Sequence, residues 1–284
     1  SNFEDKFIKG SLSRPSGFSN DEKYIYIADR SNGVIQVFNK NLEFLDILKT
    51  NKSLNRPSSL SIINIKHKKI AAIIERKEGS NSALRFFNLS ANFEAEEFSV
   101  NIDENISLND PQDMEASSSS MLYIADTLNR KILKVGLDGQ LINQADMTEI
   151  SSNKRILSKC ISVREDGEVF TSDFEKCKIL HFDNDLSFIQ EIDFSNASRE
   201  IRVIRSVFAT MGYLILLTRG KYQFLKVDYE GNIIQKLNFQ ESGIPLNHPV
   251  KIISNTEGSY LIADKENDRV IKIDRDFKFV CSTP

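Results

Sequence analysis

One phrase recurs along this chain of 284 residues: an apolar run closed by an acidic residue, a polar turn, and a second apolar run. It reads YIYIADRSNGVIQVF from Tyr24, LYIADTLNRKILKV from Leu122 and YLIADKENDRVIKI from Tyr260. The residues that end the first run are Asp29, Glu75, Asp126, Asp173, Thr218 and Asp264, at intervals of 46, 51, 47, 45 and 46 residues. A fixed period of this size is typical of repeat architectures. The sequence therefore predicts six equivalent units.

Each unit opens on a short entry phrase and continues as four short apolar runs. The entry phrases LSRP, LNRP, LNDP and LNHP end at Pro15, Pro57, Pro111 and Pro249. In the fourth unit LSKC, ending at Cys160, takes this place, and in the fifth unit the neighbourhood of Arg205 does. Between the third and fourth runs lie acidic, amide and glycine residues, which suit tight turns. Each unit is therefore predicted to be a four-stranded antiparallel meander.

The third run of each unit is apolar on both faces. Ile35 and Phe38, for example, differ in parity along their run, so their side chains point to opposite sides of a strand. Such a strand must be covered on both faces, and sheets packed face to face around a ring provide that cover. An open solenoid fits the same period, but its end repeats carry polar caps, whereas the first and last units here are as apolar as the others.

The predicted fold is therefore all-β: a six-bladed β-propeller of four-stranded antiparallel blades with a closed ring. Residues 1–284 are expected to form a single domain. Residues 1–10 are expected to complete the last blade, which leaves the C-terminal tail partly redundant. The predicted blades are approximately residues 11–50, 51–100, 105–150, 155–194, 200–240 and 244–284.

Composition narrows the function classes. The formal net charge of −3 argues against attraction of the whole molecule to nucleic acid or anionic lipid, though not against a local basic patch. Three cysteines make neither a disulfide framework nor a metal-ligand spacing. The longest apolar runs fall far short of the roughly 20 residues that a membrane-spanning helix needs. We expect a soluble chain, and the compartment stays open between the cytoplasm and export with a trimmed signal.

These phrases resemble the NHL-repeat family of β-propellers. The family signature is an entry proline, a run ending in a phrase like Val-Ala-Asp, and a following strand like Arg-Ile-x-Val. Units one, three and six match it through RP…IYIADRSNGVIQVF, DP…LYIADTLNRKILKV and HP…LIADKENDRVIKI, and the other units match in period only. The resemblance implies a propeller and a habit of binding ligands or partners, and it does not imply one function.

The repeated acid has a structural interpretation. A carboxylate at the end of the second run can accept hydrogen bonds from backbone N–H groups of the turn that follows. One such residue in each of several separate blades suits a structural part better than a catalytic pair. The residues are Asp29, Asp126, Asp173 and Asp264.

Candidate binding residues stand at the entry phrases. An antiparallel meander returns the turn between the second and third strands to the face where the entry phrase lies, so one face gathers both sets of loops around the predicted channel mouth. The residues just before the entry proline, or in the equivalent place, are Arg14, Arg56, Asp110, Lys159, Arg205 and His248. Four of these six are cations. Adjoining turns add Arg30, Arg76, Arg130, Arg219 and Arg269. Guanidinium groups suit carboxylate or phosphate ligands, and the alternative is that these arginines pair with local acids such as Glu75 or Glu266.

Three functions follow from this arrangement. The first is a non-enzymatic recognition scaffold that binds a protein segment or a small anionic ligand at the mouth. The second is a metal-dependent lyase or hydrolase, since enzymes of that kind occur among the propellers this chain resembles. We assign no catalytic, metal or cofactor residue, because only His248 of the three histidines stands at an entry phrase. The third is binding of single-stranded RNA, for which Phe174 and Tyr222 are the aromatic candidates in turns. The oligomeric state is not predicted.

Overall fold

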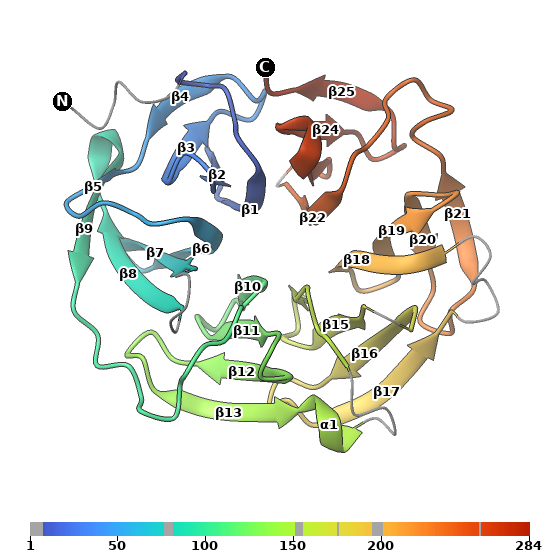
Figure 1. Cartoon of the computed structure of the whole chain (residues 1–284), viewed down its shortest axis with the longest axis horizontal. Coiled ribbons are helices and arrows are strands. Elements are labelled where there is room, and N and C mark those ends of the chain that lie inside the picture. The colour runs from blue at the N-terminus through green and yellow to red at the C-terminus, as the bar shows by residue number, and fades with distance from the viewer. Residues whose placement is uncertain (1–7, 77–81, 151–155, 175, 195–200, 256) are drawn as a thin grey trace. The chain divides into compact units, whose positions relative to one another are not determined.

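Strands make up nearly all of the regular structure (Figure 1). The computed structural model describes residues 8–76, 82–150, 156–174, 176–194, 201–255 and 257–284. Within these ranges the single α-helix is one turn, α1 (Met147–Ile150), and two short 3-10 turns are η2 (Ala91–Phe93) and η4 (Lys265–Asn267). None of the described helices is long and apolar enough to cross a membrane.

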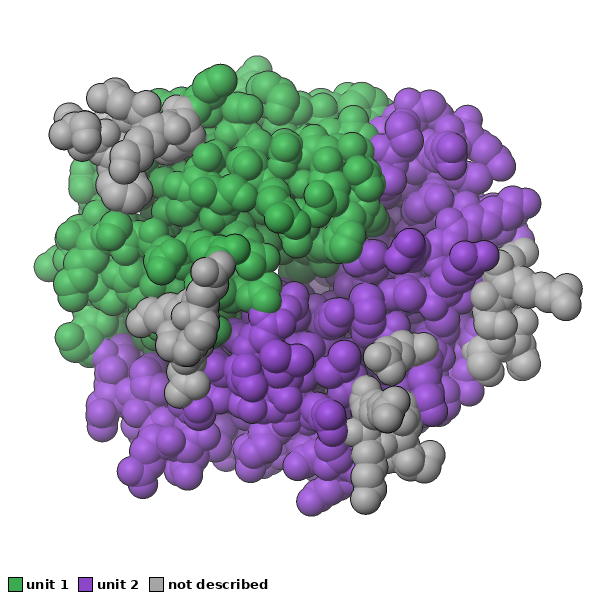
Figure 2. Space-filling view, viewed as in Figure 1, with its two compact units in different colours: residues 1–99, 247–284 green, residues 100–246 purple. Residues whose placement is uncertain are grey.

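The chain divides into two compact units (Figure 2). Unit 1 comprises residues 1–99 and 247–284, and unit 2 comprises residues 100–246. Each unit holds three sheets whose strands follow one another in chain order. We number the sheets as blades 1 to 6 along the chain, so that unit 1 contains blades 1, 2 and 6 and unit 2 contains blades 3, 4 and 5.

The blades of unit 1 are three antiparallel meanders, one of them with an added strand. Blade 1 is β1 (Pro15–Asn20), β2 (Ile25–Asp29), β3 (Val34–Phe38) and β4 (Phe44–Ile47). Blade 2 is β6 (Pro57–Ile65), β7 (Lys68–Glu75), β8 (Ala83–Leu89) and β9 (Glu94–Phe98), joined by β5 (Lys49–Thr50). Blade 6 is β22 (Pro249–Ser254), β23 (Tyr260–Asp264), β24 (Arg269–Ile273) and β25 (Phe279–Ser282).

The blades of unit 2 repeat the same plan. Blade 3 is β10 (Asp113–Ala116), β11 (Leu122–Asp126), β12 (Lys131–Val135) and β13 (Leu141–Asp146). Blade 4 is β14 (Ser162–Val163), β15 (Val169–Asp173), β16 (Lys178–Phe182) and β17 (Phe188–Asp193). Blade 5 is β18 (Ile201–Ala209), β19 (Leu214–Gly220), β20 (Phe224–Val227) and β21 (Ile233–Leu237). Six consecutive sheets of this kind confirm the predicted fold class, a six-bladed β-propeller.

Burial explains why these runs form sheets that stack. Every residue of β2, β11, β15 and β23 is buried, as is every residue of β3. Each buried Leu, Ile, Val or Phe side chain contributes roughly 1.5–3 kcal/mol of hydrophobic stabilisation. The fourth strands are mostly exposed, since β17 buries only one of its six residues. The core therefore lies between the second and third strands of neighbouring blades, as the two-faced apolar pattern predicts.

The first and last blades are neighbours in unit 1. Strand β1 packs against β22 and β23, and Phe18 and Ile27 share a buried cluster with Ile253 and Leu261. A closed ring requires this contact between the two ends of the repeat. The prediction of one domain over residues 1–284 stays a prediction.

Two predicted details of the blade edges are wrong. The C-terminal tail is not redundant, because its strand β25 pairs with β24 of blade 6. Of the segment 1–10 that was expected to complete this blade, residues 1–7 lie outside the described ranges. In addition, β5 falls in the range predicted for blade 1 but pairs in parallel with β9 of blade 2. The two ends of the chain carry similar apolar alternation, which is why pattern alone assigned the outer strand to the wrong end.

Candidate anion-binding site

The residue before each entry proline has the same unusual backbone conformation. Its φ is 56° at Arg14, 52° at Arg56, 52° at Asp110 and 59° at His248. This left-handed region is uncommon for residues other than glycine. Three of these four side chains are exposed and that of Asp110 is half-buried. The same backbone conformation therefore recurs at the start of these four blades. The side chain at this position differs between the blades and is exposed in three of them.

The repeated acid holds this conformation in place. A carboxylate oxygen accepts a hydrogen bond from the backbone N–H of the residue just before the left-handed one. These bonds run from Ser13 to Asp29 (2.9 Å), Asn55 to Glu75 (2.8 Å), Asn109 to Asp126 (2.7 Å) and Asn247 to Asp264 (2.6 Å). The acid thus ties the end of the second strand to the entry phrase. Asp29 also accepts a hydrogen bond from the backbone N–H of Asn32, in the following turn, as the sequence predicts.

The second carboxylate oxygen binds the turn through a side chain. Its donor is the amide of an asparagine three residues later: Asn32, Asn129 and Asn267, at 2.8, 2.7 and 2.7 Å. Burial raises the pKa of Asp29 and Asp126 above the usual aspartate value, and these hydrogen bonds oppose the rise. Asp173 is equally buried at 1 % exposed. The acids therefore act from inside the fold and are not presented to a ligand.

The turn after the acid bonds to the entry phrase as well. Backbone N–H groups of Ser31, Arg76, Leu128 and Glu266 donate to the carbonyls of Ser13, Arg56, Asn109 and Asn247, at 3.1 to 3.3 Å. The turn is thus held beside the entry phrase of its own blade, through the residue directly after the acid in blade 2 and through the second residue after it in the other three blades. In unit 1 the position directly after the acid is occupied by three cations: Arg30, Arg76 and Lys265.

Five cations of unit 1 are connected through the charges that act on Lys265 and Arg76, and we call them the cationic cluster: Arg14, Arg30, Arg56, Arg76 and Lys265. Burial lowers the pKa of Lys265 to about 8, helped by the positive charges of Arg30, Arg14 and Arg76 and opposed by Glu266. Burial likewise lowers the pKa of Arg76 to about 10, helped by Arg30 and Arg56. The side chains concentrate positive charge at partly desolvated positions.

Local acids neutralise part of this charge. Arg14 pairs with Glu266 at 3.0 Å, both half exposed to solvent, and the backbone N–H of Arg14 donates to Asp268 at 2.7 Å. Arg269 pairs with the buried Asp264 at 2.9 Å and so belongs to the turn itself. The two interpretations, that the arginines bind a ligand or that they pair with local acids, thus apply to different residues. Arg269 is structural, whereas the side chain of Arg14 stays half exposed to solvent although it pairs with Glu266.

Unit 2 gathers its entry residues around an aromatic ring. The Nζ atom of Lys159 lies 3.5 Å from the ring centroid of Phe174, and the guanidinium carbon of Arg205 lies 5.9 Å from it. Burial lowers the pKa of Arg205, and the charge of Arg219 adds to this effect. Phe174 occupies the position after the acid in blade 4, the counterpart of Lys265 in blade 6.

The predicted binding residues therefore fall into separate groups. Arg14 and Arg56 belong to the cationic cluster of unit 1, and Lys159 and Arg205 share Phe174 in unit 2. His248 and Asp110 keep the same backbone position, and Asp110 accepts a hydrogen bond of 2.5 Å from the side chain of Gln112. A single mouth formed by all six residues stays a prediction. Lys265 was missed by the sequence reasoning, although its register with Arg30 and Arg76 could have revealed it.

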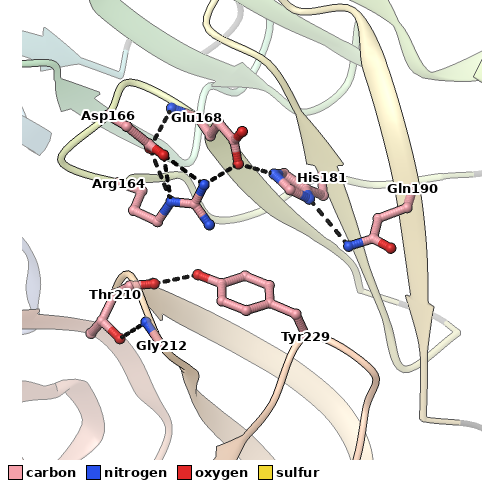
Figure 3. Close-up of polar contacts among 8 residues, drawn as sticks. All are labelled: Arg164, Asp166, Glu168, His181, Gln190, Thr210, Gly212 and Tyr229. Atoms are coloured by element: carbon pink, nitrogen blue, oxygen red, sulfur yellow. Dashed lines mark hydrogen bonds and ion pairs between the residues drawn. The ribbon is translucent and has the colours of Figure 1, made fainter.

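No metal site accompanies these groups in the part of the chain that the structure describes, where no three His, Cys, Asp or Glu side chains converge. The histidine in the strand of blade 4, His181, belongs instead to a buried polar network with Glu168 and Arg164 (Figure 3). This network involves the opposite strand ends from the entry phrases, because His181 lies near the end of β16 and Glu168 just before β15.

Comparison with known proteins supports the fold. No protein-family model matches the chain, and no curated protein sequence does either. Among solved structures, a virginiamycin B lyase from Staphylococcus aureus superposes with a TM-score of 0.60 at 11% identity, covering 96% of this chain and 86% of the lyase. A gluconolactonase from Xanthomonas campestris gives a TM-score of 0.64 at 10% identity over 89% of this chain and 84% of its own.

A third structure extends the range of activities on the same fold. Hydrazine synthase from Kuenenia stuttgartiensis gives a TM-score of 0.63 at 9% identity, covering 100% of this chain and 90% of that chain. Identities this low establish a shared fold and carry no activity across. The resemblance to the NHL-repeat family stays a prediction, since the comparisons support a propeller without assigning that family.

Proposed function

We propose that this protein is a recognition scaffold whose entry-phrase face in unit 1 binds an anionic group, a carboxylate or a phosphate. The observation that carries the proposal is the cationic cluster. Two of its members come from left-handed entry residues, Arg14 and Arg56, and three from the position after the buried acid. The same backbone hydrogen bonds in successive blades hold these residues on one set of loops.

Physical chemistry favours an anionic ligand at this place. The charges of the neighbouring arginines raise the energy of protonated Lys265 and Arg76, and an anion bound among these cations relieves that cost. Arginine offers planar forks of N–H donors that match carboxylate and phosphate oxygens, and partial burial strengthens such bonds. Because Lys265 titrates near pH 8, an anion should also hold it protonated. Binding should therefore raise the pKa of this lysine.

The test uses a charge-removal variant and a matched control. The double variant Arg14→Ala with Arg56→Ala removes two exposed members of the cluster. The control, Arg275→Ala with Lys278→Ala, removes two exposed cations from the turn between β24 and β25 of the same unit. Titration calorimetry with inorganic phosphate, citrate and a hexaglutamate peptide is expected to show binding that weakens about tenfold or more in the first variant only. Equal affinity in the two variants would contradict the proposal.

The same titrations distinguish the two other functions. A short single-stranded RNA that bound with a logarithmic affinity falling linearly with the logarithm of salt, and that required Phe174, would favour nucleic-acid recognition instead. Turnover of a lactone or ester that required an added divalent metal would favour an enzyme. Neither outcome is expected, because the solved structures with enzyme names share only the fold with this chain.

A further inference from the structure

Unit 1 contains a cavity on loops other than the entry phrases. Its volume is about 480 Å³. It is lined by the turn between β1 and β2, the turn between β6 and β7, and the turn between β8 and β9. These turns belong to blades 1 and 2. The cavity therefore lies at the junction of two neighbouring blades, and no residue of the cationic cluster lines it.

The corresponding junction of blades 4 and 5 shows why a cavity is present. There Tyr229, the second residue of the turn between β20 and β21, donates a hydrogen bond to the carbonyl of Thr210 (Figure 3). Its ring lies 5.7 Å from that of Phe170 and 5.3 Å from the guanidinium of Arg164. The matching turn residue in blade 2 is Ala91, since both turns close through the same bond, from Ser90 to Glu94 and from Asp228 to Asn232. A methyl group stands where the other junction has a phenol ring.

A second substitution adds to this difference. His181 pairs with Phe170 across blade 4, and Val37 pairs with Tyr26 at the same register in blade 1. His181 stacks on Phe170 with ring centroids 4.2 Å apart and binds Glu168 at 2.5 Å. Val37 has no polar end with which to extend a network. The 1–2 junction thus lacks both groups that fill the 4–5 junction.

Aromatic rings form one wall of the cavity. Tyr24 and Phe93 meet edge to face, with centroids 5.0 Å apart. Phe93 has a φ of 61°, like Leu42, Leu186 and Phe277 at the same place in their turns. Those three side chains are buried, at 2, 5 and 7 % exposed, whereas Phe93 is only half-buried. An apolar ring that other blades cover is left facing this space.

Positive charge completes the lining. Lys23, Lys69 and His67 all border the cavity. The acid beside it, Asp21, is occupied: it accepts bonds from Lys69 at 2.5 Å, from the Tyr26 hydroxyl at 3.0 Å and from two backbone N–H groups. Lys23 and His67 are exposed. The lining therefore combines aromatic faces with the Lys23 ammonium and the His67 imidazole at the rim.

We propose that this cavity binds a small planar aromatic carboxylate, whose ring packs against Tyr24 and Phe93 while its carboxylate faces Lys23 and His67. Ligand sites commonly enclose roughly 300–1,000 Å³, mostly apolar with a few polar groups that orient the ligand. Aromatic pairs gain from offset or edge contacts, and a carboxylate gains from a nearby cation. The site is independent of the cationic cluster.

The test measures 2-naphthoate binding by its fluorescence. The chain contains no tryptophan, so the probe can be excited without protein background. A dissociation constant on the order of 0.1 mM is expected for a ligand of this size. The neutral analogue 2-naphthylmethanol should bind about threefold more weakly, because it loses the attraction to the Lys23 ammonium at the rim.

Variants locate the binding. Ala91→Tyr copies Tyr229 and should weaken 2-naphthoate binding at least about tenfold by filling the cavity. Lys23→Gln, at an exposed position, should weaken it about threefold. The control Arg275→Ala with Lys278→Ala, in the exposed turn between β24 and β25, should leave the affinity unchanged. Thermal unfolding confirms that each variant is folded.

Three results would overturn the proposal. The first is that the wild-type chain does not bind 2-naphthoate. The second is that Ala91→Tyr and Lys23→Gln both bind 2-naphthoate with wild-type affinity. The third is that the double variant Arg14→Ala with Arg56→Ala loses 2-naphthoate binding. The last result would move the aromatic ligand to the cationic cluster. Loss of phosphate binding in that double variant with 2-naphthoate binding retained supports two separate sites.

Discussion

The junction of blades 1 and 2 and the junction of blades 4 and 5 share a strand register and differ in how the space between the blades is filled. The first contains a cavity of about 480 Å³. The second is closed by Arg164, His181 and Tyr229 (Figure 3). The second and third strands pair in the same register in blades 1 and 4, so the difference lies in side chains and in the turn of blade 2, where Asn92 is left-handed with a φ of 59°. In a repeat protein the scaffold can be uniform while single positions decide which junction is packed and which is open.

Two other junctions show that the filled state takes several forms. The counterpart of His181 in blade 3 is Lys134, whose Nζ lies 2.6 Å from Asp185 of blade 4. In blade 6 it is Lys272, which donates to the carbonyl of Lys40 in blade 1 at 2.9 Å. Each long polar side chain reaches the third-to-fourth turn of the next blade. Val37 is too short and apolar to do so, which singles out the 1–2 junction.

The largest expected effect comes from opening the filled junction. Tyr229→Ala should lower the free energy of unfolding by about 2–3 kcal/mol, because it removes a half-buried ring and leaves the carbonyl of Thr210 without this donor. Chemical denaturation at neutral pH measures the change. Tyr229→Phe, which keeps the ring, should cost only about 1 kcal/mol. If the two variants were equally stable, the ring would not be the part that fills the junction.

A smaller effect is expected from the acid beside the cavity. Asp21 is largely buried, yet the hydrogen bond from Lys69 and those from two backbone N–H groups outweigh burial and lower its pKa below 3.8. Its folded pKa lies below its unfolded one, so its stabilising contribution is present above about pH 3.8 and is lost as the pH falls through the folded value. Asp21→Asn should therefore cost about 1–2 kcal/mol at pH 7 and progressively less in acid.

Denaturation of wild type and Asp21→Asn at several pH values measures this convergence. Glu22→Gln is the matched control, since the carboxylate of Glu22, next to Asp21 in the chain, is exposed to solvent. A difference between wild type and Asp21→Asn that stayed constant from pH 7 to pH 3 would mean that the charge of Asp21 contributes nothing to the junction.

The smallest expected effect is a gain. Ala91→Tyr should raise the free energy of unfolding by about 0.5 kcal/mol by filling space in the open junction. The gain is expected to be small because the two turns differ at the next residue: Asn92 has a φ of 59°, whereas Glu230 has no positive φ. Thermal unfolding with and without 2-naphthoate measures the gain. A loss of stability would show that the two turns are less alike than their hydrogen bonds indicate.

The period of the sequence was sufficient for the fold, because an acid marks five of the six blades and an entry proline marks four of them. The entry phrase also located Arg14 and Arg56 at equivalent backbone positions, and their role in binding stays a prediction. Lys265 was missed because the cations were sought among arginines and not by register after the acid. The outer strand of blade 6 was missed because both chain ends alternate in the same way, and pairing is decided by packing in three dimensions.

The cavity could not be predicted from the sequence. It depends on what Ala91 and Val37 lack, and a missing side chain leaves no motif. Only the register of the turns, given by the bonds between Ser90 and Glu94 and between Asp228 and Asn232, shows that Ala91 and Tyr229 are counterparts. A side chain that is too small to fill its junction can be recognised only when equivalent positions of different blades are compared in the structure.

The outer strand of blade 6 has a consequence for how the chain can be cut. Because β25 follows β24 directly, blade 6 takes all its strands from one continuous stretch, and blade 1 does the same. Side-chain packing, such as Phe18 against Leu261, joins these two blades, together with side-chain hydrogen bonds such as those of Arg14 with Asp268 and of Lys272 with Lys40, and no strand pairing between them is needed. Joining the present ends and placing new ones in a loop between blades should therefore give a circular permutant whose sheets are all intact.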